Sequence, residues 1–161
     1  MDEPKIKSLK GLNITFGHSP DADDAFMFFG LAKNKIPINF KVSHLMEDIE
    51  SLNKRATLGN LEVTAISAAH YPKVSDHYQI MSCGSSVGRN YGPILVSNKK
   101  INENKLSGLK IAIPGEFTTS YLLFKIFISQ NIQTVFKHFD DVIDSIKSGE
   151  TDAGILLHEG Q

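Results

Sequence analysis

The feature that most constrains the fold of this chain is the alternation of strand-like and helix-like segments along its length. The expected strands are 13–17, 38–42, 62–66, 79–82, 94–97, 109–113, 134–139 and 152–157, and the expected helices begin near residues 24, 48, 67, 121 and 142. This order is typical of α/β proteins with mostly parallel sheets. We therefore expect an α/β fold in which helices cover parallel sheets.

The segment 84–93 (GSSVGRNYGP) interrupts this alternation. Its density of Gly and Ser is typical of a loop or hinge. We therefore expect two lobes, residues 1–88 and 89–161, joined by a hinge over 84–93. In the first lobe, the helical segment AFMFFGLAKN is apolar on nearly all sides, a pattern that predicts deep burial.

The composition excludes several classes of protein. The formal net charge is −1 and no run of Lys or Arg occurs, which argues against a binder of duplex nucleic acid. No apolar run approaches the roughly 20 residues that span a membrane, and residues 1–12 lack the apolar core of a secretory signal. The single Cys83 excludes an internal disulfide and a cysteine-cluster metal site. We expect a soluble cytoplasmic protein without nucleic-acid or membrane partners.

Polar residues follow four of the expected strands at the points where those strands end. They are His18-Ser19-Pro20, Ser67, Thr118-Thr119-Ser120 and His158-Glu159. In open parallel sheets, ligands bind outside the carboxyl ends of the strands. Two of these groups precede the hinge and two follow it, so we expect them to face one another across a cleft.

Each of these groups also has a structural explanation. Thr118, Thr119 and Ser120 stand at an expected helix start, where free N–H groups suit a carboxylate or phosphate, but one of them is equally expected to cap the helix. His158 is suited to general-base catalysis near neutral pH, although a His at a strand end is more often a structural hydrogen-bonding group. Ser67 by itself is an ordinary residue before a helix.

The acidic group Asp21, Asp23 and Asp24 has the oxygen ligands that magnesium and calcium prefer. It lacks the spacing and the Gly of a calcium loop, so capping and complementarity to the helix dipole are the favoured interpretation. The residues His44, His70, His77 and His138 are scattered, without the spacing of a zinc site. We interpret these histidines as surface or structural residues and expect no metal.

Segments spread over nearly the whole chain resemble the 1,4-dihydroxy-6-naphthoate synthases. They are GHSPDADDAFMFFGLA, EDIESLNKRATLG, the Ser67-Ala68-Ala69 turn, GSSVGRNYGPILVS, IAIPGEFTTSYLL and GETDAGILLHEGQ, and they extend from Asn13 to Gln161. Each segment is modest alone, but their common order makes the match specific to this family.

The resemblance implies a fold similar to the type II periplasmic binding proteins, with a ligand between two α/β lobes. It also implies a lyase of the futalosine route to menaquinone, which converts cyclic dehypoxanthine futalosine to 1,4-dihydroxy-6-naphthoate without a metal or organic cofactor. The family's proposed base falls on His158. Its substrate-lining positions fall on Asn53, Ser67, Thr119 and Ser120, to which we add Ser19 after the first strand. A further motif of the family carries Arg89, Asn90 and Gly92.

Two departures from the family stand out. Where its members read Cys-Pro-Asn-Asp-Thr, this chain has Asp21-Ala22-Asp23-Asp24-Ala25. The change adds an acid near the expected ligand, so a subgroup with another substrate is an open alternative. Family members also continue beyond the His-Glu pair and cross back to complete the first lobe, so the C-terminal return is expected to be missing from this fragment. Apolar surface on both lobes, including parts of AFMFFGLA and YLLFKIF, is then expected to lack cover and to favour association, for example as a homo-oligomer.

Other functions remain open beside this lyase. The same fold serves solute-binding proteins that capture a small carboxylate and perform no chemistry, and the fold alone does not separate the two classes. A related pathway enzyme, similar to chorismate dehydratase, is a further alternative, as is a non-catalytic partner domain. The expected base at His158 favours the enzyme, because a protein that only binds needs hydrogen-bond donors but no base. In every reading of the site, the expected partner is a small-molecule carboxylate.

Overall fold

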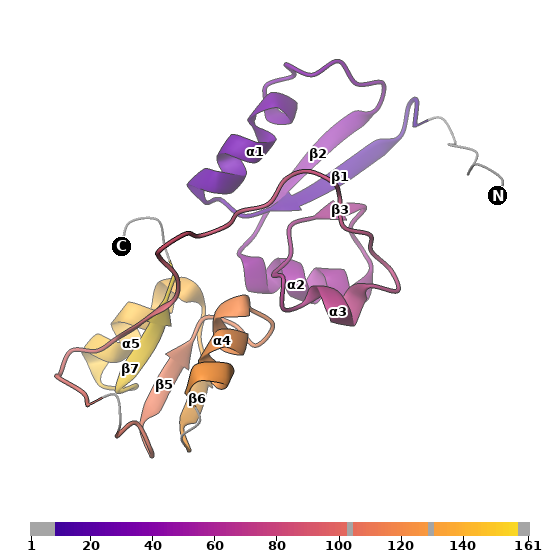
Figure 1. Ribbon diagram of the computed structural model, residues 1–161. Helices are drawn as coiled ribbons and strands as arrows, with labels where there is room; N and C mark the ends of the chain where they lie inside the picture. Colours follow the sequence, from indigo (N-terminus) through magenta and orange to yellow (C-terminus); the bar gives the residue numbers. More distant parts are fainter. Residues whose placement is uncertain (1–8, 103–104, 129–130, 158–161) are drawn as a thin grey trace.

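The strands of the chain form two separate sheets (Figure 1). A computed structural model describes residues 9–102, 105–128 and 131–157. The first sheet contains β1 (Asn13–His18), β2 (Lys41–Met46) and β3 (Val63–Thr64), in the order β2-β1-β3 with both neighbours parallel to β1. The helices α1 (Ala22–Ala32), α2 (Ile49–Leu58) and α3 (Tyr71–Val74) follow these strands in turn. We call this part of the chain the first lobe.

The second sheet has four strands in the order β4-β7-β5-β6. They are β4 (Ile94–Val96), β5 (Lys110–Ile113), β6 (Gln133–Phe136) and β7 (Ala153–Leu156). Both β6 and β7 run parallel to β5, whereas β4 is antiparallel to β7. The helices are α4 (Thr119–Phe127), the short 3₁₀ helix η1 (Phe139–Asp141) and α5 (Val142–Ser148). This second lobe confirms the expected α/β architecture with mostly parallel strands.

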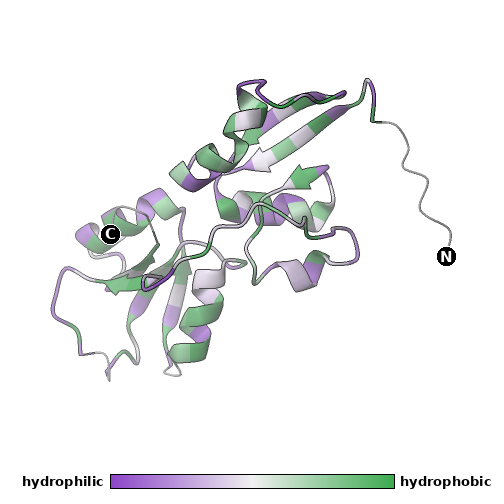
Figure 2. Ribbon diagram, turned by 45° about the horizontal axis from the view of Figure 1, so that its top comes forward, coloured by the Kyte–Doolittle hydropathy of each residue, from purple (hydrophilic) through white to green (hydrophobic). Residues whose placement is uncertain are grey.

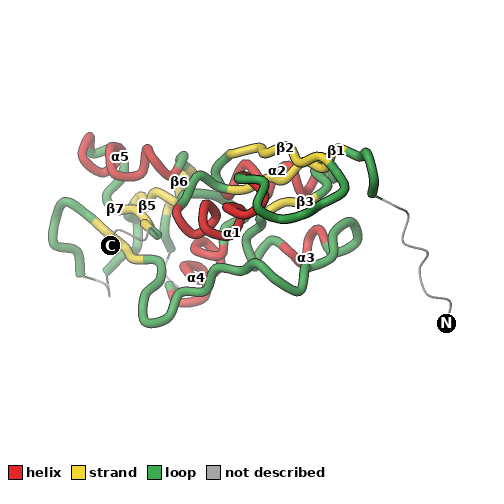
Figure 3. The backbone as a smooth tube through the Cα atoms, turned by 90° about the horizontal axis from the view of Figure 1, so that it is seen from above, coloured by secondary structure: helices red, strands yellow, loops and turns green. Residues whose placement is uncertain are grey.

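The second sheet is covered on both faces, as Figure 3 shows with α4 and α5 on opposite sides of it. On the α4 face, Ile111, Ile113 and Ile155 are buried and pack against Tyr121 and Phe124. On the other face, Ala112 packs with residues of α5, namely Val142 and Ile146. Successive residues of β5 thus serve opposite faces, as the alternation of side chains in a strand requires. The first lobe buries a smaller apolar set, Phe16, Leu52, Ala56, Leu61 and Val74.

Residues 75–93 connect the two lobes and contain no helix or strand. The loop expected over 84–93 is therefore confirmed, but the strand expected at 79–82 is wrong. A strand is stabilised by hydrogen bonds to a neighbouring strand, and neither sheet offers this segment one. The exact lobe boundary at 88/89 stays a prediction.

The helices begin within a few residues of the predicted starts. The predicted burial of α1, in contrast, is not observed. Phe26 is 85% exposed and Phe29 is 55% exposed, so the prediction of deep burial is wrong. One side of α1 packs on the first sheet, and its apolar pattern continues around a side that no element of the described residues covers. Figure 2 shows the resulting hydrophobic stretches on α1 and α4. Ile126 (61%) and Phe127 (76%) of α4 are also exposed, which confirms the expectation of uncovered apolar surface on both lobes.

Candidate functional site

Asn53 and Ser67 form a doubly hydrogen-bonded pair in the first lobe. Asn53 lies on α2 with no exposed surface, and its Oδ1 accepts from the Ser67 N–H at 2.9 Å. The Asn53 Nδ2 donates to the Ser67 Oγ at 3.0 Å. Because the Ser67 oxygen is used here as an acceptor, its hydroxyl proton is directed elsewhere. The pair therefore fixes the Ser67 oxygen after the carboxyl end of β3 and leaves its hydroxyl proton available as a donor.

Helix α4 begins with three hydroxyl residues that have different tasks. Thr118 is the cap, because its Oγ1 accepts from the Tyr121 N–H at 3.2 Å and donates to the Gly115 carbonyl at 2.9 Å. Thr119 and Ser120 are the first two helical residues, and backbone N–H groups at such positions have no partner within the helix. Of the three hydroxyl residues, the one that caps the helix is therefore Thr118. The side chains of Thr119 and Ser120 are not used for the cap.

The two lobes meet at these hydroxyl residues. The Ala69 N–H, two residues after Ser67, donates to the Thr119 Oγ1 at 3.2 Å. Asn53 therefore binds the turn that contains Ser67, and the same turn binds Thr119 of the other lobe through Ala69. Ser120 is next to Thr119 in α4. The side chain of Thr119 is half-buried and that of Ser120 is buried. This cluster lies at the carboxyl ends of β3 and β5, where ligands bind in such sheets.

Ser19 makes its hydrogen bonds within its own turn. Its Oγ donates to the Asp21 Oδ2 at 2.8 Å, and its N–H donates to the Asp24 Oδ2 at 2.5 Å. Asp24 is buried, and burial raises the pKa of its carboxyl above the usual value. A binding role for Ser19 stays a prediction. Asp21 occupies the N-cap position of α1, although its side chain makes no hydrogen bond to the helix. The part of the chain that the structure describes contains no group of three or more potential metal ligands.

Two histidines at the end of the first sheet form a pair that the sequence did not predict. The His18 Nε2 and the His44 Nδ1 are 3.0 Å apart, and the His18 ring stacks on Phe28 with centroids 4.7 Å apart. Burial and the neighbouring His18 lower the pKa of His44 below 6.5. The two histidines meet because β1 and β2 are neighbouring strands in a particular register. That register cannot be read from the sequence, so the pair could not be predicted.

The predicted base, His158, and its neighbour Glu159 lie outside the described residues. The preceding strand, β7, is parallel to β5 and adjacent to it in the sheet. Arg89, Asn90 and Gly92 lie in the exposed connection between the lobes, where Asn90 has a left-handed backbone with φ of 62°.

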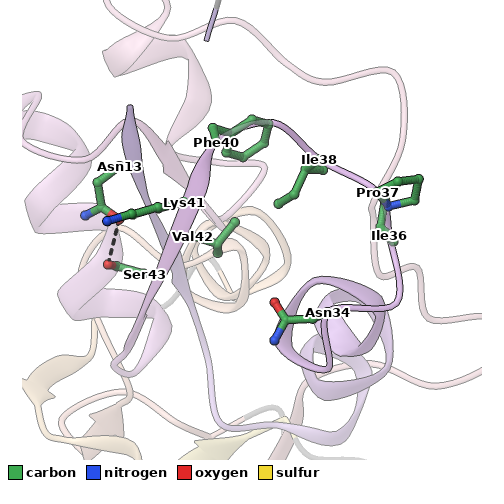
Figure 4. Close-up of a pocket in the computed structure, with 9 residues that line it drawn as sticks. All are labelled: Asn13, Asn34, Ile36, Pro37, Ile38, Phe40, Lys41, Val42 and Ser43. Carbon is green, nitrogen blue, oxygen red and sulfur yellow. Dashed lines mark hydrogen bonds between the residues drawn. The ribbon is translucent and has the colours of Figure 1, made fainter. Parts of the chain in front are cut away.

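A pocket of about 610 Å³ lies elsewhere, at the opposite end of the first sheet (Figure 4). Its lining comes from the first residues of β1 and β2 and from the segment that precedes β2, and it includes Asn13, Asn34, Ile36, Ile38 and Lys41. These are the amino ends of parallel strands, whereas ligands of such sheets bind at the carboxyl ends. The pocket shares no residue with the predicted site.

Comparison with known proteins shows which family this chain resembles. Over 92% of its length the chain is 32% identical to the 1,4-dihydroxy-6-naphthoate synthase of Thermus thermophilus, and the match covers 53% of that relative. The chain thus spans about half the length of the curated relatives it matches. It is also similar to a crystal structure of a protein from Archaeoglobus fulgidus, with 44% identity and a TM-score of 0.85 over 92% of this chain and 55% of the other.

More distant structures show the fold. An ancestral amino acid-binding protein, described as a precursor of cyclohexadienyl dehydratase, superimposes with a TM-score of 0.61 at 16% identity, over 89% of this chain and 69% of its own. The fold is therefore that of the periplasmic binding proteins, as the resemblance implied. No helix among the described residues is long and apolar enough to cross a membrane. A family model described as menaquinone biosynthesis matches residues 14–161, and this chain therefore belongs to the menaquinone biosynthesis family.

Proposed function

We propose that this chain acts in menaquinone biosynthesis as a lyase that converts cyclic dehypoxanthine futalosine to 1,4-dihydroxy-6-naphthoate. The observation that carries the proposal is a pair of contacts at one turn of the first lobe: Asn53 binds Ser67, and Ala69, two residues later, binds Thr119 of the second lobe. The name of the relatives, which are 1,4-dihydroxy-6-naphthoate synthases, supports the same reaction.

The cluster supplies the groups that such a substrate needs. A carboxylate is held best by N–H and O–H donors at a helix start, which Thr119 and Ser120 offer at the first turn of α4. The hydroxyl of Ser67, oriented by Asn53, holds a further polar group of the substrate. In this proposal, neutral His158 removes a proton from the bound substrate and begins an elimination that makes the ring aromatic.

The test is to incubate the chain with cyclic dehypoxanthine futalosine and to follow 1,4-dihydroxy-6-naphthoate by mass spectrometry, with the Thermus thermophilus relative as the positive control. The full-length protein is tested beside the chain. We expect product from the full-length protein, and we expect His158→Asn in it to lower turnover by about 10²-fold while binding of the substrate stays nearly unchanged. Unchanged turnover in His158→Asn removes this residue from the role of base.

A second candidate is a solute-binding protein without catalysis, favoured by the similarity of the fold to an amino acid-binding protein. It predicts that the chain binds a small carboxylate and forms no product. Calorimetry with 1,4-dihydroxy-6-naphthoate and with free amino acids separates the two candidates. Binding of an amino acid alone, with no turnover of the futalosine derivative, overturns the lyase.

A further inference from the structure

A buried carboxylate of the first lobe binds backbone of the second. Glu50 stands in the first turn of α2 and is 7% exposed. Its Oε1 accepts from the Glu116 N–H at 3.1 Å, and its Oε2 accepts from the Phe117 N–H at 3.0 Å. A buried carboxylate is costly unless charged or polar groups satisfy it, and hydrogen bonds to an ionised acceptor are stronger than those between neutral groups. Glu50 is therefore satisfied by the loop of the other lobe.

The loop is shaped to receive this carboxylate. A Cβ atom at Gly115 would lie 2.5 Å from the Glu50 Oε2 and 2.8 Å from the Glu50 Cβ. Any side chain at this position would force the carboxylate away, so the close approach requires glycine. The ring of Phe117 also packs against His70 of the first lobe, with centroids 4.6 Å apart. The loop from Gly115 to Phe117 is thus bound to the first lobe by polar and aromatic contacts.

The same loop leads directly into the candidate site. Thr119 follows Phe117 by two residues and accepts the Ala69 N–H, which belongs to the turn that also contains Ser67. Glu50 and Asn53 are three residues apart on α2, so one helix contacts the loop before Thr119 and orients Ser67. Whatever holds this loop against α2 also sets the separation between Thr119 and Ser67.

We propose that Glu50 is a positioning residue that holds the 115–119 loop in register with Asn53 and Ser67, and so fixes the two halves of the substrate site relative to each other. This inference rests on the proposed function in that the site it organises is the one assigned to the carboxylate substrate. Glu50 itself does not touch the substrate. It occupies the N–H groups of Glu116 and Phe117 and leaves those of the first turn of α4 to the ligand.

The experiment uses the complete chain and has two independent readouts. The first is amide hydrogen exchange at Glu116 and Phe117, and the second is the affinity for 1,4-dihydroxy-6-naphthoate by calorimetry. Glu50→Ala removes both acceptors, and we expect exchange at both amides to be about tenfold faster or more and the Kd to rise about tenfold. Glu50→Gln keeps the size of the side chain and one acceptor oxygen, so we expect an intermediate effect on both readouts.

Glu47→Gln is the matched control. Glu47 also belongs to the first lobe, but its carboxylate pairs with Arg55 of the same lobe at 2.5 Å. We expect this variant to change neither the exchange of the two amides nor the affinity. If Glu50→Ala fails to fold, as circular dichroism will show, the comparison of Glu50→Gln with Glu47→Gln decides the question.

The outcomes separate the positioning role from the proposed function. Unchanged exchange in both Glu50 variants overturns the inference, whatever the ligand does. Faster exchange with unchanged affinity also overturns it, because the loop would then be held without consequence for the site. Tighter binding of the naphthoate in Glu50→Ala would also overturn the inference, because it would show that the Glu50 carboxylate competes with the ligand and does not position the site. If the wild-type chain does not bind the naphthoate, the proposed function fails, and the exchange readout still decides whether Glu50 holds the loop.

Discussion

At the residue scale, His70 is a buried histidine whose pKa is shifted by its surroundings. It is 1% exposed, its Nε2 lies 3.0 Å from the Thr57 Oγ1, and its Nδ1 has no hydrogen-bond partner among the described residues. Burial lowers the pKa of His70 below 6.5, and the Lys73 ammonium acts in the same direction. The shift favours the neutral form of a ring that itself packs against Phe117 of the second lobe, with centroids 4.6 Å apart.

This burial predicts a loss of stability in acid. Because the pKa of His70 is lower in the folded chain than in the unfolded chain, the unfolded chain takes up the proton first as the pH falls. The contribution of neutral His70 to the free energy of unfolding is complete above about pH 6.5 and declines as the pH falls through the folded pKa. Urea unfolding at a series of pH values should show a smaller decline for His70→Gln than for the wild-type chain.

His77→Gln is the control for this measurement, because His77 is exposed. It should leave the pH profile of the wild-type chain unchanged. If the free energy of unfolding falls equally with pH in the wild type and in His70→Gln, the pKa of His70 does not differ between the folded and unfolded chains.

Individual residues were only partly predictable from the sequence. Thr119, Ser120 and Ser67 were predicted because each follows a strand-like run. Asn53 came from the family resemblance alone, since an Asn within an amphipathic helix gives no sign that a turn fourteen positions later will bind it. Glu50 was missed, because an acid in the first turn of a helix is already explained by the helix dipole.

At the element scale, α2 is the helix whose ends are best defined. Asp48 caps it, with its Oδ1 accepting from the Glu50 N–H at 3.0 Å and from the Ser51 N–H at 3.1 Å. At the other end, Gly59 adopts the left-handed backbone with φ of 64°. These ends matter beyond the helix itself, because α2 carries both Glu50 and Asn53.

Removing the cap should destabilise the chain. We expect Asp48→Ala to lower the free energy of unfolding by about 1 kcal/mol and Asp48→Asn, which retains an acceptor, to lower it by less. Chemical denaturation with circular dichroism measures both. Asp21→Ala provides the comparison, because Asp21 occupies the same position at α1 without a side-chain hydrogen bond to the helix. An equal loss in Asp21→Ala and Asp48→Ala would contradict a specific capping role.

The order of elements was predictable, whereas their pairing decided the exact bounds. The expected strand at 38–42 is observed as β2 over Lys41–Met46, because pairing with all of β1 extends it toward His44 and Met46. The segment 79–82 has a similar local pattern but no neighbouring strand, and it remains a loop. Local sequence thus indicates which segments are suited to a sheet, while the sheet itself selects among them.

At the scale of the whole molecule, both lobes expose large apolar side chains. Phe26 of α1 and Phe127 of α4 are 85% and 76% exposed, and together with their neighbours they form more apolar surface than scattered single residues would. We expect the chain to bind an apolar dye such as anilinonaphthalene sulfonate and to associate with rising concentration in analytical ultracentrifugation.

Matched variants identify the surface responsible. Phe26→Ser and Phe127→Ser should lower both the dye signal and the association. Tyr91→Ser, at a 53% exposed aromatic residue of the connection between the lobes, should lower neither. A wild-type chain that is monomeric at all concentrations and does not bind the dye would contradict this prediction.

Each of the two sheets is built from one uninterrupted stretch of chain, the first from residues 13–64 and the second from 94–156. During synthesis on the ribosome, the described strands of the first sheet, β1 to β3, are therefore all made before β4. These three strands are free to pair before the second sheet exists. What must wait is the meeting of Glu50 with Glu116, which follows β5, so this contact between the two lobes forms only after synthesis of the second lobe has begun.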